Sequence, residues 1–317
     1  MSTEVVGWLA FAVLFIAMIT LDLVVGHKKG KEIDIKSSLK WTGFWIGVAL
    51  AFGVGIYFFK GQTKALEFLA GYLLEYSLSV DNLFVFLMIF SYFSVPPVHQ
   101  HTALFWGIMG ALVMRGIFIA VGVVLVTKFS WLIYVFGVFL IYTAIKMAKG
   151  HGDEINPEKN PILRLLHKMM PVTTDYGDGK FFLHIDGIRH ATPLLAVILV
   201  IGPTDLMFAL DSIPAILAVT TDPFIVYTSN VFALMGLRSL FFALAGLMSI
   251  FHYIRHGLVV ILMFVGIKML LQGFVHIPIG WSLGFIAGTL AIAIIASIMR
   301  SHKMEMVVNP EDGKDKP

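Results

Sequence analysis

Residues 41–59 read WTGFWIGVALAFGVGIYFF, a run that contains no Asp, Glu, Lys or Arg. A second such run, residues 276–299, reads HIPIGWSLGFIAGTLAIAIIASIM. An uncharged apolar helix of about 20 residues crosses the hydrocarbon core of a bilayer, which is about 30 Å thick. Over the whole chain, 58% of residues are hydrophobic and 14% are charged, whereas soluble domains are about half apolar and about a quarter charged. The sequence therefore predicts an all-α integral membrane protein.

The hydropathy pattern predicts nine transmembrane helices. They are expected at residues 7–25, 41–59, 66–94, 102–127, 131–148, 190–218, 224–250, 256–274 and 277–299. Residues 1–306 are then a single transmembrane domain with one long loop at residues 150–189. An amphipathic run at 162–170 in this loop fits either a plain linker or a helix on the membrane surface. The polar residues 307–317 are expected to form a disordered cytoplasmic tail.

Lys and Arg are distributed unevenly among the predicted connections. The outer connections hold only Lys60, Lys64 and Lys128, while the first inner loop, the long loop and the tail are rich in both residue types. Because Lys and Arg favour the cytoplasmic side, the N-terminus is predicted outside and the C-terminus in the cytoplasm. The net charge of +3 is too small to indicate a nucleic-acid partner. Assembly as a homo-oligomer or with other membrane proteins is left open.

Two segments of the chain repeat one pattern of charged residues. Each segment has a pair of acids six residues apart, an Arg in the next predicted span and a Lys in the span after that. These residues are Glu75, Asp81, Arg115 and Lys146 in the first segment, and Asp205, Asp211, Arg238 and Lys268 in the second. The repeats cover residues 66–149 and 190–274 and contain three predicted spans each. Since three is odd and the connecting loop stays inside, the sequence predicts inverted repeats, a plan typical of transporters.

The charged residues inside the predicted spans need compensation, because each costs about 2.5–3.5 kcal/mol or more at the bilayer centre. Positions seven apart lie on one helical stripe, which places Asn82 with Glu75 and Ser212 with Asp205. The sequence thus predicts a cation site of oxygen ligands with a supporting network of bases. The ligands would be Glu75, Asp81, Asn82, Asp205, Asp211 and Ser212, and the network Arg115, Arg238, Lys146 and Lys268. Alternatively, the four acids only neutralise the four bases as structural ion pairs.

The residue types restrict the ion. Cysteine is absent, and all the histidines lie in connections or near the ends of predicted spans, so nitrogen and sulfur ligands are not expected. Oxygen ligands suit Mg²⁺, Ca²⁺ and Mn²⁺. Pro203 and Pro214 should also free backbone carbonyls one turn earlier, because proline cannot donate a hydrogen bond. The sequence contains no enzyme motif that we recognise, so neither catalysis nor a prosthetic group is expected.

Four stretches carry a resemblance to a known family. They are EYSLSVDNLFVF at 75–86, SYFSVP at 91–96, DLMFALDSIPAI at 205–216 and VTTDPFIV at 219–226. With them the chain resembles the TerC family, closest to its Alx-type members, within the LysE superfamily of exporters. The resemblance implies a bacterial inner-membrane protein linked to manganese efflux, to metalation of exported proteins and, by name, to tellurium resistance. It also implies an acidic metal site on Glu75, Asp81, Asp205 and Asp211.

The chain departs from the family pattern at Gly202, where members commonly have a glutamate three residues before the first acid of the second repeat. Loss of this carboxylate would alter affinity or ion choice, and a helix break at Gly202-Pro203 could compensate by exposing carbonyl oxygens. The expected function is Mn²⁺ export, and proton antiport is the candidate coupling. One alternative is export of an amino acid or other small solute, with Arg115 and Arg238 binding its carboxylate. Another is a non-transporting scaffold that aids metalation of exported proteins.

Overall fold

The computed structural model describes residues 3–26, 35–149, 161–185, 187–245, 253–275 and 277–308. For some helical residues, Asp81 and Asp211 among them, it describes the backbone alone. The α-helices among these residues are α1 (Thr3–Gly26), α2 (Ile35–Lys60), α3 (Gln62–Tyr92), α4 (Pro97–Lys128), α5 (Leu132–Ala148), α6 (Pro161–Met169), α7 (Pro193–Leu217), α8 (Pro223–Ala245), α9 (Ile254–Leu271) and α10 (Ile279–Val308). A 3-10 turn at Gly177–Gly179 and a hairpin of β1 (Phe182–Ile185) and β2 (Ile188–Ala191) lie between α6 and α7.

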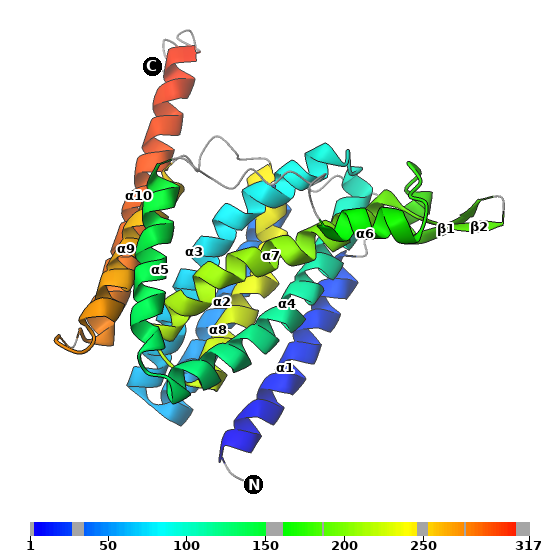
Figure 1. Ribbon diagram of the computed structural model, residues 1–317. Coiled ribbons are helices and arrows are strands. Elements are labelled where there is room, and N and C mark those ends of the chain that lie inside the picture. The colour runs from blue at the N-terminus through cyan, green and yellow to red at the C-terminus, as the bar shows by residue number, and fades with distance from the viewer. Residues whose placement is uncertain are drawn as a thin grey trace.

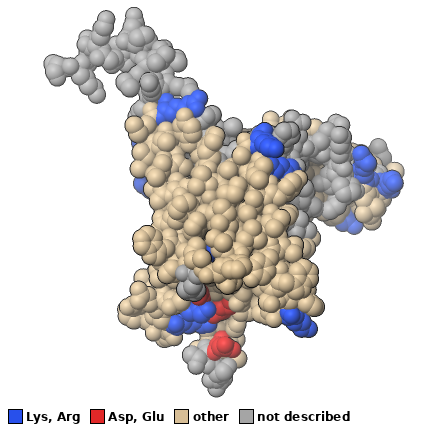
Figure 2. All heavy atoms as spheres, turned by 60° about the vertical axis from the view of Figure 1, so that its left-hand side comes forward, with Lys and Arg blue, Asp and Glu red and all other residues tan. Residues whose placement is uncertain are grey.

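The chain is an integral membrane protein with several apolar helices. Among the described residues, six helices are long and apolar enough to cross a bilayer, namely α1, α2, α3, α4, α8 and α10. Helices α5, α7 and α9 contain shorter apolar segments. All nine coincide with predicted spans, although the count of nine spans stays a prediction. Figure 2 shows charged side chains gathered toward two ends of the molecule, with a broad band of other residues between them.

Several helix ends differ by a few residues from the ends of the predicted spans. The span expected from residue 190 begins at Pro193, because residues 188–191 pair as β2 with β1. Pro193 suits the first turn of a helix, where its missing N–H is not needed, and the Thr192 hydroxyl before it donates to Lys180 O at 2.7 Å. The hairpin has a sequence signal that was not used, Asp-Gly at residues 186–187, the typical pair of a tight β-turn.

Other helix ends also differ from the prediction. Helix α9 ends at Leu271 rather than at residue 274, and α10 runs to Val308, beyond the predicted end at 299 and into the predicted tail. The last residues of the span predicted at 224–250 and the tail from residue 309 lie outside the described residues. The helix break expected at Gly202-Pro203 is absent, because α7 is α-helical from Pro193 to Leu217.

The helices form two groups (Figure 1). Helices α2, α3, α4, α7 and α8 make the central bundle, in which α3 packs on α8 and α4 packs on α7. Helices α5, α9 and α10 stand together at one side, with α9 between close neighbours α5 and α10. Helix α1 packs on α8, and the β1–β2 hairpin projects away from the bundle beside α6.

Glycines at three positions allow the helices to approach one another closely. A Cβ on Gly266 of α9 would lie 2.8 Å from the carbonyl oxygen of Gly137 on α5. In the central bundle, a Cβ on Gly71 of α3 would meet Ile216 and Ser229, and one on Gly107 of α4 would meet Ile201 at 2.6 Å. Small residues at such crossings let backbones pack against each other where lipid supplies no hydrophobic force.

We expect Gly266→Ala to separate α9 from α5 and to destabilise the protein by about 1–3 kcal/mol, as overpacking does in other cores. The atom in the way is backbone, so a rotamer change cannot relieve the contact. Gly288→Ala on α10 is the matched control, because a Cβ there meets nothing within 4 Å. Thermal unfolding in detergent measures both variants, and equal melting temperatures would contradict the crossing.

Candidate functional site

The guanidinium of Arg115 on α4 lies at the centre of the bundle with a side-chain exposure of 1%. Its Nε donates to Asp205 Oδ2 at 2.8 Å and its Nη2 to Asp205 Oδ1 at 3.2 Å, so the contact with α7 is bidentate. Its Nη1 donates to Glu75 Oε1 on α3. One buried cation therefore holds the first acid of each predicted repeat, and these acids come from two different helices.

Two neutral side chains complete this group, which we name the Arg115 cluster: Arg115, Glu75, Asp205, Ser212 and Asn230. The amide nitrogen of Asn230 on α8 donates to Glu75 Oε2 at 2.9 Å. Arg115 Nη1 lies 3.4 Å from both Asn230 Oδ1 and Ser212 Oγ. Asp205 and Ser212 face the same guanidinium, as expected for positions seven apart on a helix.

The Arg115 cluster carries a formal charge of −1, because two carboxylates face one guanidinium. All five side chains are buried. Buried ions lose their hydration, and their mutual attraction offsets this loss only when the geometry is good and the remaining lone pairs are satisfied. Ser79, which donates from Oγ to Glu75 Oε1 at 3.2 Å, supplies one further donor. The cluster is thus an oxygen-rich centre that already holds a cation, and that cation belongs to the protein.

The other predicted site residues are placed less completely. Asn82 is buried on α3, seven residues beyond Glu75. The side chains of Asp81 and Asp211 lie outside the described residues, so their role in a four-acid site stays a prediction. Within the described residues, no three His, Asp or Glu side chains come together as a preformed metal site.

The predicted base network does not gather at one place. Arg238 on α8 lies apart from the Arg115 cluster and donates from Nη2 to Asp22 Oδ1 on α1 at 2.6 Å. Asp22 is itself buried, so this pair is a second ion pair inside the molecule. Lys146 and Lys268 are partly buried on α5 and α9.

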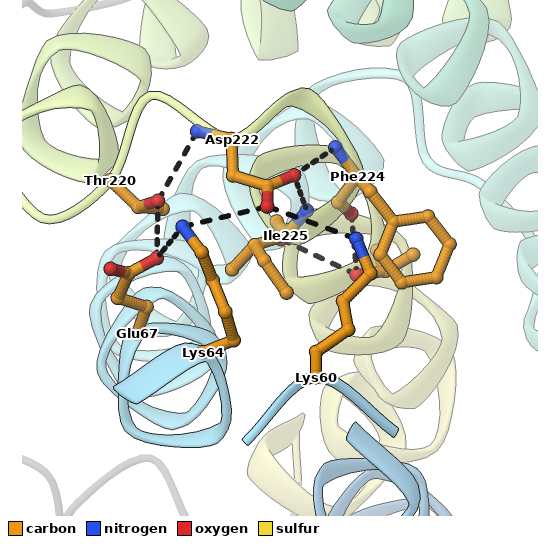
Figure 3. Close-up of polar contacts among 8 residues, drawn as sticks. Lys60, Lys64, Glu67, Thr220, Asp222, Phe224 and Ile225 are labelled. Carbon is orange, nitrogen blue, oxygen red and sulfur yellow. Dashed lines mark hydrogen bonds and ion pairs between the residues drawn. The ribbon is translucent and has the colours of Figure 1, made fainter. Parts of the chain in front are cut away.

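A third charged group, the Lys64 cluster, joins α2, α3 and the turn between α7 and α8 (Figure 3). It consists of Lys60, Lys64, Glu67, Thr220 and Asp222. Glu67 Oε2 accepts from Lys64 Nζ at 2.8 Å and from the Thr220 hydroxyl at 2.5 Å, and Lys64 Nζ also lies 3.5 Å from Asp222 Oδ2. Asp222 Oδ1 caps α8 by accepting from Phe224 N at 3.0 Å and Ile225 N at 3.4 Å.

The Lys64 cluster and the Arg115 cluster share helix α3. Glu67 and Glu75 are eight residues apart, or about 12 Å along a helix axis. Gly71 lies between them, packed against Ile216 and Ser229. The more exposed Lys64 cluster is therefore separated from the buried Arg115 cluster by tightly packed helix surfaces.

Sequence reasoning missed three participants: Asn230, Asp22 as the partner of Arg238, and the Lys64 cluster. A signal for Asn230 was present, because residues 227–230 read Tyr-Thr-Ser-Asn inside an otherwise apolar predicted span. Polar side chains at membrane depth are uncommon and usually functional. The partners themselves could not be read from the sequence, because they lie on distant helices.

Comparison with known proteins supports one family. Residues 60–305 match the model of the integral membrane protein TerC family. An uncharacterized membrane protein of Myxococcus xanthus, STKORF319, is 48% identical over 295 residues, which are 93% of this chain and 92% of that protein. Alx of Escherichia coli (strain K12), named as a candidate membrane-bound redox modulator, is 43% identical over 305 residues, or 93% of this chain and 95% of Alx. No solved structure matches the chain.

We expect Asn230→Ala to destabilise the protein by about 1–3 kcal/mol, because it leaves the buried Glu75 Oε2 without its amide donor. Ser229→Ala is the matched control on the same helix, since the Ser229 hydroxyl donates only to carbonyls of its own helix. Unfolding of both variants in detergent would measure the difference. An effect no larger than that of Ser229→Ala would remove Asn230 from the cluster.

Proposed function

Because this chain belongs to the TerC family of integral membrane proteins, we propose that it is a transporter that exports a divalent cation, with Mn²⁺ as the first candidate. The observation that carries the proposal is the convergence of Glu75 and Asp205, from separate helices, with the oxygens of Ser212 and Asn230. Carboxylate, amide and hydroxyl oxygens together suit a hard divalent ion.

The proposed site contains more ligands than the Arg115 cluster. We assign Asp81 and Asp211 as its principal ligands, with Glu75, Asp205, Asn82 and Ser212 as supporting ligands. Mn²⁺ is the transported ion rather than a resident cofactor. Carboxylates exchange a proton for a metal ion, which makes proton antiport the proposed coupling. The role is transport and involves no enzymatic step.

The proposed architecture has nine spans, of which α3–α5 and α7–α9 form inverted repeats. The helix pairing supports this plan. In this plan, α7 is the counterpart of α3, and α8 is the counterpart of α4. The contact of α3 with α8 then corresponds to the contact of α7 with α4, and both contacts are present. Substrate sites of such transporters lie at the repeat interface near the midplane, and Glu75 and Asp205 come from the first helix of each proposed repeat.

The proposed location is the bacterial inner membrane, with the N-terminus outside and the C-terminus in the cytoplasm. The distribution of Lys and Arg supports this orientation. It places the Lys64 cluster at the outer face and α6 with the β1–β2 hairpin at the inner face. The proposed partners are the bilayer and a divalent cation, and a nucleic acid is not among them. Assembly as a homo-oligomer or with other membrane proteins is left open. We also propose that the chain belongs to the LysE superfamily.

Two other functions remain as candidates. Arg115 already binds two carboxylates, so a guanidinium of this kind would also suit the carboxylate of an exported amino acid. A non-transporting scaffold for metalation would fit the name of the Alx relatives if metal supply is how such a protein affects redox balance. This chain has no cysteine, so it cannot act through its own thiols.

The primary test is uptake of Mn²⁺ into inside-out vesicles. Wild type should accumulate Mn²⁺, and the Asp81→Asn, Asp211→Asn double variant should fall to the level of empty vesicles, because its site has lost two charges. Asp222→Asn is the matched control and should keep uptake, since Asn caps helices as well as Asp does.

Uptake by the double variant would defeat the site assignment. Absence of uptake by folded wild type would defeat Mn²⁺ export. Competition by amino acids and not by Mn²⁺ would then favour the organic-solute function. Preserved biological function after neutralisation of Glu75, Asp81, Asp205 and Asp211 would favour the scaffold.

A second prediction concerns Gly202. A Cβ there meets nothing within 4 Å, so Gly202→Glu should fold and restore the glutamate common in the family. We expect its Mn²⁺ affinity to rise about tenfold, because affinity depends on the number of charged ligands. Gly202→Gln, of similar size and without charge, should show a smaller rise. Binding of Mn²⁺ by Gly202→Glu at the wild-type affinity would contradict the expected effect of Gly202.

A further inference from the structure

We propose that Arg115 is a tethered cation that competes with the transported ion for the same oxygens and thereby sets the affinity and charge selectivity of the site. The inference rests on the proposed function, since it assigns a role within the cation site. Nε, Nη1 and Nη2 of this one side chain contact oxygens of four residues: Glu75, Asp205, Ser212 and Asn230. Three of these four were predicted as metal ligands from their spacing.

Arg115 contacts the types of oxygen atom that a divalent metal ion binds. The Asp205 carboxylate binds the guanidinium through both oxygens, at 2.8 and 3.2 Å, and Glu75 approaches from α3. Arg is suited to such a place because its planar fork binds carboxylates bidentately. A divalent ion uses the same carboxylate, amide and hydroxyl oxygens. The guanidinium and the ion therefore cannot be bound to these oxygens at the same time.

The charges decide which ions can displace Arg115. With the guanidinium in place, Glu75 and Asp205 keep a formal charge of −1. A divalent ion in its place neutralises both carboxylates, whereas a monovalent ion only repeats the charge of Arg115 and lacks its hydrogen bonds. In a buried environment of low dielectric, one unit of charge has a large energetic effect. The tethered cation thus excludes Na⁺ and K⁺ and admits divalent ions.

Arg115 and the two acids that it binds come from different helices. Arg115 reaches the acids from α4, a helix that carries no acid in the Arg115 cluster, so its release separates α4 from Glu75 and Asp205 without breaking a bond within α3 or α7. Displacement of the guanidinium loosens the contact of α4 with α7 at this point. Binding of the ion is thereby coupled to the helix contact that joins the two proposed repeats.

Competition by Arg115 should weaken the apparent affinity of the site for Mn²⁺. A ligand that binds only when a competing group is released has its apparent Kd raised by the inverse of the released fraction. Removal of Arg115 should therefore tighten Mn²⁺ binding, which is the reverse of what loss of a structural or substrate-binding residue would do. Arg115→Lys should act in the same direction, because a single ammonium cannot span both oxygens of Asp205 while reaching Glu75.

The test is equilibrium binding of Mn²⁺ to the purified full chain in lipid nanodiscs, with every variant measured in the same buffer. We expect Arg115→Gln to bind Mn²⁺ about tenfold more tightly than wild type or better, and Arg115→Lys to lie between them. Excess Na⁺ should compete with Mn²⁺ in Arg115→Gln more than in wild type. Arg238→Gln is the matched control, since it also removes a buried positive charge, from the separate pair with Asp22, and should change the affinity less than about twofold.

The outcomes separate the inference from the proposed function. If wild type binds Mn²⁺ and both folded Arg115 variants bind it equally or more weakly, the tethered cation is overturned while the transporter stands. If Arg238→Gln tightens binding as much as Arg115→Gln, a general change of charge explains the effect and the inference is overturned. If no folded variant binds Mn²⁺, the proposed function and the inference are both overturned. If Arg115→Gln does not fold, Arg115→Lys decides alone by the same criterion.

Discussion

The structure depends on the need to compensate charge inside an apolar bundle. Glu75 and Asp205 are buried on α3 and α7, and Arg115 supplies the compensating cation from α4. Because the guanidinium needs both acids, three helices are fixed relative to one another by a single side chain. The glycine contacts of Gly71 and Gly107 bring these helices close enough for that reach. The ion pairs of Arg115 therefore link α3, α4 and α7 inside the bundle.

The three charged groups differ in their exposure to solvent. The Lys64 cluster is partly exposed, with side-chain exposures of 34% for Lys64 and 20% for Asp222, so solvent screens it and its individual pairs are worth little. The Arg115 cluster and the Asp22–Arg238 pair are buried, so loss of one partner leaves an uncompensated charge. The two predicted repeats also use their arginines differently. Arg115 joins the acids of both repeats, whereas Arg238 joins its helix to α1, which lies outside the repeats.

The sequence predicted the elements whose signal is local. Long apolar runs located the nine apolar helices, although α10 continues nine residues past the predicted end of its span. Spacing on a helix placed Ser212 on the same stripe as Asp205. The prediction failed where the structural element was short or where the interaction partner lay far away in the sequence. The β1–β2 hairpin was divided between the predicted loop at 150–189 and the span expected from residue 190, although Asp186-Gly187 marked a turn, because hydropathy averages over such a short segment. The bond of Asn230 to Glu75 and that of Arg238 to Asp22 join helices far apart in the chain, and no periodicity within one helix reports which other helix it faces.

The separations of the buried ion pairs along the chain have a consequence for biosynthesis. Arg115 follows Glu75 by 40 residues, Asp205 follows Arg115 by 90, and Arg238 follows Asp22 by 216. A chain inserted from its N-terminus can thus form the Glu75–Arg115 pair as soon as α3 and α4 are in the bilayer. The Asp22–Arg238 pair can form only after α8 has been synthesised. The ion pair that joins α1 to α8 can consequently form only after most of the described helices have been synthesised.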